Sequence, residues 1–383
     1  MNIDSKFIHL LRLTTVILFF FILWIPIIQM VYPILPEMKS TENRQLAEKP
    51  KIKFSLKALK NYAKRYNMYL NDHYGLRNFI IRVNCRIHIN LLHTSPKRDV
   101  VLGREGWLYY DNNNDGNNLK DFYGESNFTK ADLDKIVEKI IKIKTYCSER
   151  NILFRIVFAP NKHTIYPEFL PPEIMERRGL STRLDQLMDY LNRNQMGATI
   201  IDLRPVLISS KNTFPFPLYY RIDMHWNRLG AFIAYAEIMK NLRLNYPQIK
   251  ILDIKNYRFV MKEKKEGDLA DFISVSGLLK DQEVILEPPV PSLTKKTDPN
   301  IRLENVGIEI SRYHAENCNY LKLLMFRDSF AVGLLPYFSE SFSDSLYIWT
   351  YKWLDVYFSI IEKERPHMVI LELAERFVSN LTS

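Results

Sequence analysis

A long uncharged stretch near the amino terminus places the strongest constraint on this chain. No charged residue occurs from Leu13 to Leu35, and the centre of the stretch reads TTVILFFFILWIPIIQMVY. At a rise of about 1.5 Å per residue, a helix over this stretch is long enough to cross a bilayer. A cleaved signal peptide would have a shorter apolar run and a small-residue cleavage site, and neither is present. We therefore expect residues 1–35 to form an uncleaved membrane anchor. The alternative, a buried helix of a soluble protein, conflicts with a run that is apolar on all faces.

Charge does not fix the orientation of this anchor. Two basic residues, Lys6 and Arg12, precede the apolar run, and five follow it: Lys39, Arg44, Lys49, Lys51 and Lys53. The positive-inside count therefore does not favour a translocated carboxyl side. Long domains cross a membrane largely regardless of charge, which weakens this objection and leaves both orientations open.

The composition of the chain is that of an ordinary globular protein, with 47% hydrophobic and 25% charged residues. A net charge of +10 suits an anionic partner such as an acidic glycan, a phospholipid surface or a nucleic acid. The charges are spread out and show no nucleic-acid fingerprint, so we expect no nucleic-acid partner. Three cysteines exclude a dense disulfide framework, although one bridge between Cys147 and Cys318 stays open. No C-x-x-C pair occurs, and we expect neither a metal nor a cofactor.

Residues 36–98 are expected to separate the anchor from the main domain. The segment 36–54 is polar, with prolines near both ends, and is typical of a linker. Basic and apolar positions alternate at helical spacing over 55–93. One amphipathic face collects Leu56, Leu59, Tyr62, Ala63 and Tyr66. We interpret this segment as a helix that covers the catalytic core.

From Asp99 to the end of the chain, predicted strands and helices alternate. A hairpin is expected over 99–110, where Gly103 and Gly106 interrupt strand-like residues. Helices are predicted at 133–151, 182–195, 228–242 and 351–366, and strands at 152–160, 198–207, 319–326 and 367–373. This alternation predicts an α/β fold with a parallel sheet and helices on both faces. Residues 258–317 break the rhythm with charges and prolines, and we expect an insertion with little regular structure, a lid or a rim.

The segment FRDSF (326–330) places a serine directly after a predicted strand. At such a turn the hydroxyl of Ser329 is lifted out at the sheet edge, and its N–H belongs to a helix amino terminus that can stabilise a developing oxyanion. The competing interpretation is a helix N-cap, for which Ser and Asp are preferred in any case. Taken alone, the segment favours the cap.

A second segment, RIDMHWNRLGAF (221–232), brings a carboxylate and an imidazole together. Asp223 and His225 are two residues apart, so in an extended segment they point to the same side. A carboxylate beside imidazole fixes its tautomer and stabilises imidazolium, as a general base on serine requires. Taken alone, the pair favours an ordinary loop histidine, and a metal site is weaker still because no second His or Cys is nearby. Together with Ser329 and an alternating α/β core, however, the pair predicts a Ser-His-Asp triad.

Seven segments carry a resemblance to a known family. They are ENRQLAEKP (42–50), YLNDHYGLRNFIIRVN (69–84), VVLGREGWLYY (100–110), PNKHTIYPEFLP (160–171), DMHW (223–226), EGDLA (266–270) and RDSF (327–330). In this order they resemble the SGNH-hydrolase-like domain of the alginate O-acetylation proteins, of AlgJ and AlgX type, and the related DHHW proteins. The resemblance implies a circularly permuted SGNH fold, in which Asp and His precede the serine, the reverse of the usual order.

The resemblance also implies roles for the matching residues. Ser329 would be the nucleophile, His225 the base and Asp223 the residue that orients the base. Segment similarity offers Lys162, Arg327, Arg376 and Trp226 as substrate-binding candidates. The family displays this domain outside the cytoplasmic membrane, which implies a single-pass inner-membrane protein with a periplasmic catalytic domain. Its implied partners are a polysaccharide acceptor and a separate multi-spanning acyltransferase that supplies acetyl groups.

Two departures from the family pattern keep alternatives open. Position 327 is Arg where the family motif has Gly, which would allow close backbone approach at the turn. Arg327 either blocks that approach or binds an anionic acceptor. No carbohydrate-binding domain follows the last predicted strand, so we expect the membrane-anchored, single-domain type. Beside the O-acetyltransferase, a carbohydrate esterase with the same triad and a non-catalytic glycan-binding scaffold remain as alternatives.

Overall fold

A computed structural model describes residues 5–36, 45–51, 56–113, 115–116, 118–292, 294–299, 309–316, 320–350 and 356–382. The chain divides into two compact units. The first unit contains residues 1–96 together with 271–278, and the second contains 97–270 and 279–383.

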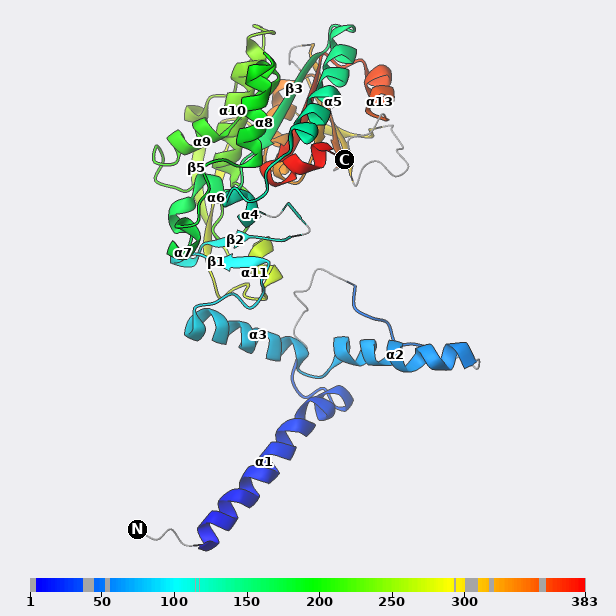
Figure 1. Cartoon of the computed structure of the whole chain (residues 1–383), viewed down its shortest axis with the longest axis vertical. Helices are drawn as coiled ribbons and strands as arrows, with labels where there is room; N and C mark the ends of the chain where they lie inside the picture. Colours follow the sequence, from blue (N-terminus) through cyan, green and yellow to red (C-terminus); the bar gives the residue numbers. More distant parts are fainter. Residues whose placement is uncertain are drawn as a thin grey trace. The chain divides into compact units, whose positions relative to one another are not determined.

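The first unit is helical. It contains α1 (Ser5–Val31), α2 (Leu56–His73) and α3 (Arg77–Ile87), which continues into the π-helical turn η1 (His88–Leu92). Within α1, the segment Ile8–Val31 is long and apolar enough to cross a membrane, and its side chains are almost entirely exposed. The helices expected over the anchor and over 55–93 are therefore present (Figure 1). Much of the predicted linker 36–54 lies outside the described residues.

The second unit is built on a seven-stranded sheet in the order β4-β3-β11-β9-β10-β8-β7. Its five parallel strands are β4 (Ile200–Asp202), β3 (Leu153–Ala159), β11 (Met368–Ala374), β9 (Lys322–Arg327) and β10 (Asp344–Trp349). Two antiparallel strands, β8 (Ile310–Ala315) and β7 (Thr294–Thr297), extend the β10 edge. The sheet is therefore mixed, and its central strands carry the parallel arrangement that the sequence predicts.

Helices cover both faces of this sheet, as predicted (Figure 1). Along β3, Phe154, Ile156 and Phe158 point to one face, whereas Val157 and Ala159 point to the other. The first face packs against α5 (Lys130–Ser148), α8 (Arg183–Arg193) and α13 (Val356–Glu364). The second packs against α9 (Arg204–Ser210), α10 (Arg228–Arg243) and α12 (Leu335–Ser341). Burial on both faces explains why β3 and β11 are mostly apolar, with one charged residue each, Arg155 and Glu372.

Short elements connect these layers. The predicted hairpin consists of β1 (Val100–Leu102) and β2 (Leu108–Tyr110). The short helices are α4 (Asn118–Phe122), α6 (Lys162–Ile165) and α7 (Pro172–Met175). The 3-10 turns are η2 (Arg104–Gly106), η3 (Pro167–Phe169), η4 (Gly197–Thr199), η5 (Ile254–Asn256), η6 (Phe330–Gly333) and η7 (Glu375–Thr382).

Three predictions about local structure are wrong. Residues 258–317 are not poor in regular structure, because β5 (Arg258–Lys264) and β6 (Asp281–Glu287) form an antiparallel hairpin around α11 (Asp268–Phe272), and β7 and β8 follow. The charges that suggested a loop lie on exposed strand positions, where lysines protect sheet edges. The strand predicted over 198–207 ends at Asp202, because Pro205 starts α9. Strand β10 is missing from the prediction altogether.

The structure describes only one of the two cysteines, Cys147 and Cys318, between which the sequence allows a disulfide. Cys147 is a buried free thiol on α5. Burial raises its pKa to about 12, so the thiol stays protonated and unreactive. Cys318 lies outside the described residues.

Candidate active site

Ser329 lies on the turn that follows the central strand β9. This strand pairs with β10 on one side and β11 on the other, so the turn opens at the carboxyl edge of the sheet, where α/β proteins bind ligands. Ser329 occupies the N-cap position of η6, yet its side chain makes no capping hydrogen bond. Asp328 caps the turn instead, since its carboxylate accepts the Phe330 N–H at 2.8 Å and the Ala374 N–H at 2.7 Å. The Ser329 hydroxyl is therefore left for another partner.

That partner is His225. The Ser329 Oγ lies 2.9 Å from His225 Nε2, and His225 Nδ1 lies 2.8 Å from Asp223 Oδ1. The same Asp223 oxygen accepts the His225 backbone N–H at 3.0 Å, which fixes the two-residue loop. All three side chains are partly exposed, the imidazole at 24% and the Asp223 carboxylate at 15%. The structure thus brings together the three residues that the sequence nominated as a triad.

A fourth residue, Asp268, joins this group and was not nominated. Its Oδ2 lies 3.3 Å from His225 Nδ1, and its Oδ1 accepts the Met224 N–H at 2.8 Å. Gly267 makes this possible, because a Cβ there would lie 2.5 Å from the Ile222 carbonyl oxygen. The EGDLA segment was noted only as a similar loop, so a signal for Asp268 was present without a role attached to it.

The electrostatics of the group follow from these contacts. Burial by itself lowers the pKa of the His225 imidazole, but hydrogen bonds to the carboxylates of Asp223 and Asp268, and their charges, outweigh it and raise the pKa to about 9. Burial alone would raise the pKa of the Asp223 carboxyl. The hydrogen bonds from His225 and its positive charge outweigh burial and hold the Asp223 pKa below its usual range. Burial, with the nearby Asp223 charge, raises the pKa of Asp268. Near neutral pH the protonated form of His225 is therefore favoured beside the Asp223 carboxylate, and the neutral imidazole is the minor form.

The same residues also form a possible ligand set for a cation. One nitrogen and two carboxylate oxygens of Asp223, His225 and Asp268 lie within 4.8 Å of one another. Such donors suit a divalent cation. The 2.8 Å distance between His225 Nδ1 and Asp223 Oδ1 fits a shared proton, however, and leaves no space for an ion between these two atoms.

Lys162 and Trp226, expected at the substrate, instead hold the loops in place. Lys162 is buried, and its ammonium donates to the carbonyl oxygens of Leu108 at 2.7 Å and Arg221 at 3.1 Å. It thereby ties the β1–β2 hairpin to the loop that carries His225. Trp226 is buried too, and its indole N–H donates to the Phe330 carbonyl at 3.0 Å, which ties the same loop to the Ser329 turn. Neither side chain is accessible to a large substrate.

The two candidate arginines are also buried. The Arg327 guanidinium stacks 4.4 Å from the Trp349 ring centroid and lies 3.3 Å from Glu309 Oε2, so it is not displayed to an anionic acceptor. Arg376 packs against Phe377 and lies 5.6 Å from the ring of Phe330, the residue after the candidate nucleophile. Neither guanidinium is displayed at the surface, and a substrate-binding role for these two arginines stays a prediction.

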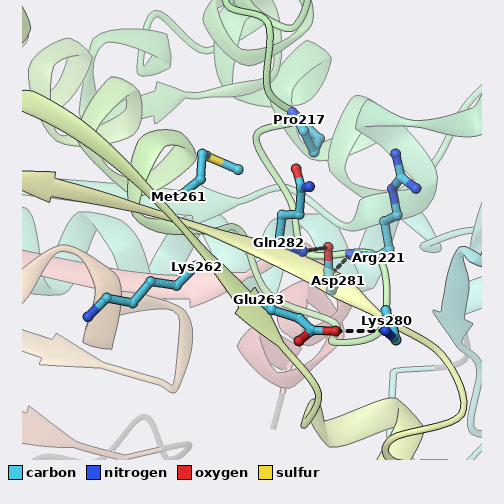
Figure 2. A pocket seen from close by; sticks show the side chains of 8 residues that line it. All are labelled: Pro217, Arg221, Met261, Lys262, Glu263, Lys280, Asp281 and Gln282. Atoms are coloured by element: carbon cyan, nitrogen blue, oxygen red, sulfur yellow. Dashed lines mark hydrogen bonds and ion pairs between the residues drawn. The ribbon is translucent and has the colours of Figure 1, made fainter.

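A cavity of about 530 Å³ lies beside the loop that carries Asp223 (Figure 2). Pro217 and Arg221 line one side, and residues of the β5–β6 hairpin and its connection line the rest: Met261, Lys262, Glu263, Lys280, Asp281 and Gln282. Figure 2 shows Lys280 paired with Glu263, at 3.0 Å. The Asp281 carboxylate accepts the backbone N–H groups of Arg221, Ile222 and Gln282. Two of the acidic groups in the wall are thus already satisfied within the protein.

This fold and site define an α/β protein of the SGNH-hydrolase-like class. The model of the family described as SGNH hydrolase-like domain, acetyltransferase AlgX, matches residues 100–296, more than half of the chain. The chain therefore belongs to this family, and membership supports an O-acetyltransferase type of function.

Three solved structures are similar to this chain, and the first of them, at a TM-score of 0.50, shares its fold. A DHHW family protein from Eubacterium siraeum is 16% identical, with a TM-score of 0.50 over 73% of this chain and 94% of its own. Bacillus cereus PatB1 is 18% identical, with a TM-score of 0.49 over 74% and 97%. The O-acetyltransferase domain of Pseudomonas putida AlgJ is 16% identical, with a TM-score of 0.44 over 73% and 92%. No match to a curated protein was found.

Proposed function

We propose that this protein is a membrane-anchored O-acetyltransferase that acetylates hydroxyls of a polysaccharide outside the cytoplasm. One observation carries the proposal: the unbroken series of contacts from Asp223 Oδ1 to His225 Nδ1, at 2.8 Å, and from His225 Nε2 to Ser329 Oγ, at 2.9 Å. These are the distances at which an oriented imidazole takes a proton from serine.

In the first half-reaction, neutral His225 Nε2 takes the Ser329 hydroxyl proton while Oγ attacks the carbonyl carbon of an acetyl donor. The tetrahedral intermediate collapses when the imidazolium returns the proton to the leaving group, and acetyl-Ser329 remains. Within the part of the chain that the structure describes, the Ser329 N–H makes no hydrogen bond. It is therefore available to the developing oxyanion.

In the second half-reaction, a sugar hydroxyl gives its proton to His225 and attacks the acetyl carbonyl carbon. The bond between that carbon and Ser329 Oγ then breaks, and the imidazolium returns the proton to Oγ, which restores free Ser329. Water competes with the sugar at this step, so transfer needs a groove that holds the glycan. The cavity beside Arg221 is our candidate for part of that groove. Its lining of Met261, Pro217 and long polar side chains suits a carbohydrate, which presents both apolar ring faces and hydroxyls.

The donor and the location belong to the same proposal. We place α1 in the inner membrane and the second unit on the periplasmic side. Among the described residues, α1 alone is long and apolar enough to span a membrane, and one span does not make a path for acetyl groups. A separate multi-spanning acyltransferase would therefore deliver acetyl groups to Ser329. A carbohydrate esterase with the same triad is the second candidate, because the geometry is identical and only the acceptor differs.

The proposal is tested with the full-length protein in nanodiscs and an activated acetyl ester. Intact mass and ester turnover are recorded with and without acidic and neutral oligosaccharides. Ser329→Ala removes the nucleophile, and Ser209→Ala, at an exposed serine on α9, serves as the matched control.

We expect an acetyl adduct on the native protein and on Ser209→Ala that is absent from Ser329→Ala. One class of oligosaccharide should discharge the adduct faster than water and become acetylated. Turnover that depends on Ser329 but never acetylates a glycan would favour the esterase. Equal adduct formation on the native protein and Ser329→Ala would refute the triad and favour the non-catalytic scaffold.

A further inference from the structure

Helix α3 of the first unit carries an apolar stripe that is exposed. Phe79, Val83 and Ile87 are four residues apart and share one face of the helix with Ile80. Phe79 is 49% exposed, Val83 37%, Ile87 45% and Ile80 47%. Leu91 and Leu92 extend the exposed apolar surface into η1. A contiguous surface of this kind on a helix usually marks an interaction site.

The opposite face of α3 is the one buried within the protein. Cys85 and Ile89 are 4% and 7% exposed, and Ile273 and Val275 of the same compact unit are buried as well. On a helix, positions 85 and 89 lie roughly half a turn away from positions 83 and 87. The helix therefore has two apolar faces, one already used in packing and one open. The predicted role of this segment as a cover for the catalytic core does not explain the open face.

The charge of the segment identifies a class of partner. Residues 77–92 contain Arg77, Arg82 and Arg86 and no acidic residue. Arg86 is exposed next to the stripe, whereas Arg77 and Arg82 are half-buried. A basic helix with an apolar stripe matches the pattern of helices that lie in a membrane interface with anionic headgroups.

The position of α3 relative to α1 supports this partner. Gly75, two residues before α3, approaches α1 so closely that a Cβ would lie 2.0 Å from the Pro26 carbonyl oxygen. A cavity of about 320 Å³ is lined jointly by Gln29 and Met30 of α1, by Pro33 just beyond its end, and by residues between Tyr69 and Phe79. Pro26 is five residues before the end of α1, or about 7.5 Å along its axis. The start of α3 is thus level with the last turns of the candidate span, the depth at which interfacial helices lie.

We propose that α3 and η1 lie in the interface of the membrane that α1 crosses, on the carboxyl side of α1, with Phe79, Val83 and Ile87 at the acyl boundary. The partner is a phospholipid bilayer with anionic headgroups. This inference rests on the membrane anchor of the proposed function and on no part of its catalytic chemistry.

The experiment places an environment-sensitive fluorophore at single cysteines of the full-length protein in liposomes of zwitterionic and anionic phospholipid. The parent carries Cys318→Ser, and its remaining cysteines, Cys85 and Cys147, are buried. The test positions are Val83→Cys and Ile87→Cys. Ile22→Cys in α1 is the lipid-facing control, and Lys135→Cys, exposed on α5, is the aqueous control. Each label is exposed to spin-labelled lipids and, separately, to iodide in the water.

We expect the labels at 83 and 87 to show blue-shifted emission and several-fold stronger quenching by spin-labelled lipid than the label at 135, with weaker quenching by iodide. Labels at 83 and 87 that are accessible to iodide while the label at 22 is quenched by lipid would overturn the inference and leave the anchor intact. Protection from both quenchers would overturn it in favour of a protein surface or a second copy. A label at 22 that lipid does not quench would refute the anchor and the inference together.

Discussion

The variant Asp268→Asn gives the sharpest test of the site, because it removes a charge and keeps the shape of the side chain. Asp268 Oδ2 lies 3.3 Å from His225 Nδ1, and with Asp223 it raises the pKa of the imidazole to about 9 against the effect of burial. A neighbouring opposite charge shifts a pKa by about one to three pH units. Asp223 makes the shorter contact, at 2.8 Å, so we assign about one unit to Asp268. One unit corresponds to about 1.4 kcal/mol, a factor of ten in an equilibrium.

The interaction of the Asp268 charge with His225 affects kcat/KM differently below and above the pKa of His225. Below pH 9 the resting enzyme carries an imidazolium, and so does the transition state in which His225 has taken the serine proton. Loss of the Asp268 charge destabilises both by the same amount, so kcat/KM near neutral pH changes little. Above pH 9 the resting imidazole is neutral, and only the transition state loses the charge. There the plateau of kcat/KM falls by about tenfold, and the acidic limb moves down by about one pH unit.

The assay is the pH dependence of kcat/KM for an activated acetyl ester, measured for native protein, Asp268→Asn and the control Glu266→Gln. Glu266 is an exposed carboxylate two residues away, and its removal should leave the profile unchanged. A limb that stays in place in Asp268→Asn, or a loss of rate that is equal at all pH values, would refute the reasoning. The second result would mean that Asp268 holds the loop without affecting the proton affinity of His225.

The pH dependence of the free energy of unfolding gives an independent test of the raised pKa of His225. The folded pKa of His225, about 9, is above the ordinary value of 6.5. Its contribution to the free energy of unfolding, about 3 kcal/mol, is therefore complete below pH 6.5 and is lost as the pH rises through 9. Denaturation by urea at several pH values should show a smaller loss in Asp268→Asn than in the native protein.

Substitutions at two further positions, Glu372 and Lys162, test the support beneath the site. Glu372 is fully buried on β11, its Oε2 accepts the Asp328 N–H at 3.0 Å, and burial with the nearby Asp328 charge raises its pKa far above the usual range. We expect Glu372→Gln to keep the stability and the ester turnover of the native protein. Glu372→Leu leaves the Asp328 N–H without an acceptor and should lower the free energy of unfolding, measured by urea denaturation, by about 1–3 kcal/mol. An equal loss of stability in both variants would show that the carboxylate is ionised. Lys162→Met removes the buried ammonium that donates to the Leu108 and Arg221 carbonyl oxygens. It should lower the free energy of unfolding by about 1–3 kcal/mol and also lower kcat/KM. Unchanged values of both would contradict a scaffold role for Lys162.

The sequence predicts well those features that neighbouring residues determine. Strands β3 and β11 are mostly apolar because both of their faces are buried. Helices α5 and α8 have capping boxes at their N-caps, Thr129 and Thr182. The loop pair of Asp223 and His225 is also local, since two-residue spacing alone puts the side chains together. What these patterns share is that no distant segment is needed to interpret them.

The features that the sequence did not predict depend on distant segments. Asp268 reaches His225 because Gly267 permits close approach of the two loops at the Ile222 carbonyl. Residue spacing along the sequence does not predict this contact. Lysine is usually a surface residue, and Lys162 is buried because two carbonyls from separate loops converge on its ammonium. Strand β10 and the hairpin β5–β6 become strands by pairing, and their mixed polar and apolar sequences do not predict this.

Arg327, in place of glycine, was the feature that favoured a non-catalytic protein, and the structure removes the steric part of that argument. The residue continues strand β9, pairs with Trp349 of β10 and keeps negative φ, so its backbone does not need glycine. Its guanidinium stacks on the Trp349 ring while Ser329 Oγ, two residues further on, stays 2.9 Å from His225 Nε2. Arg327 therefore does not block the turn, and its side chain is buried. The choice between transferase and esterase then depends on the acceptor that occupies the groove, since water and a sugar hydroxyl can both use His225 as the base.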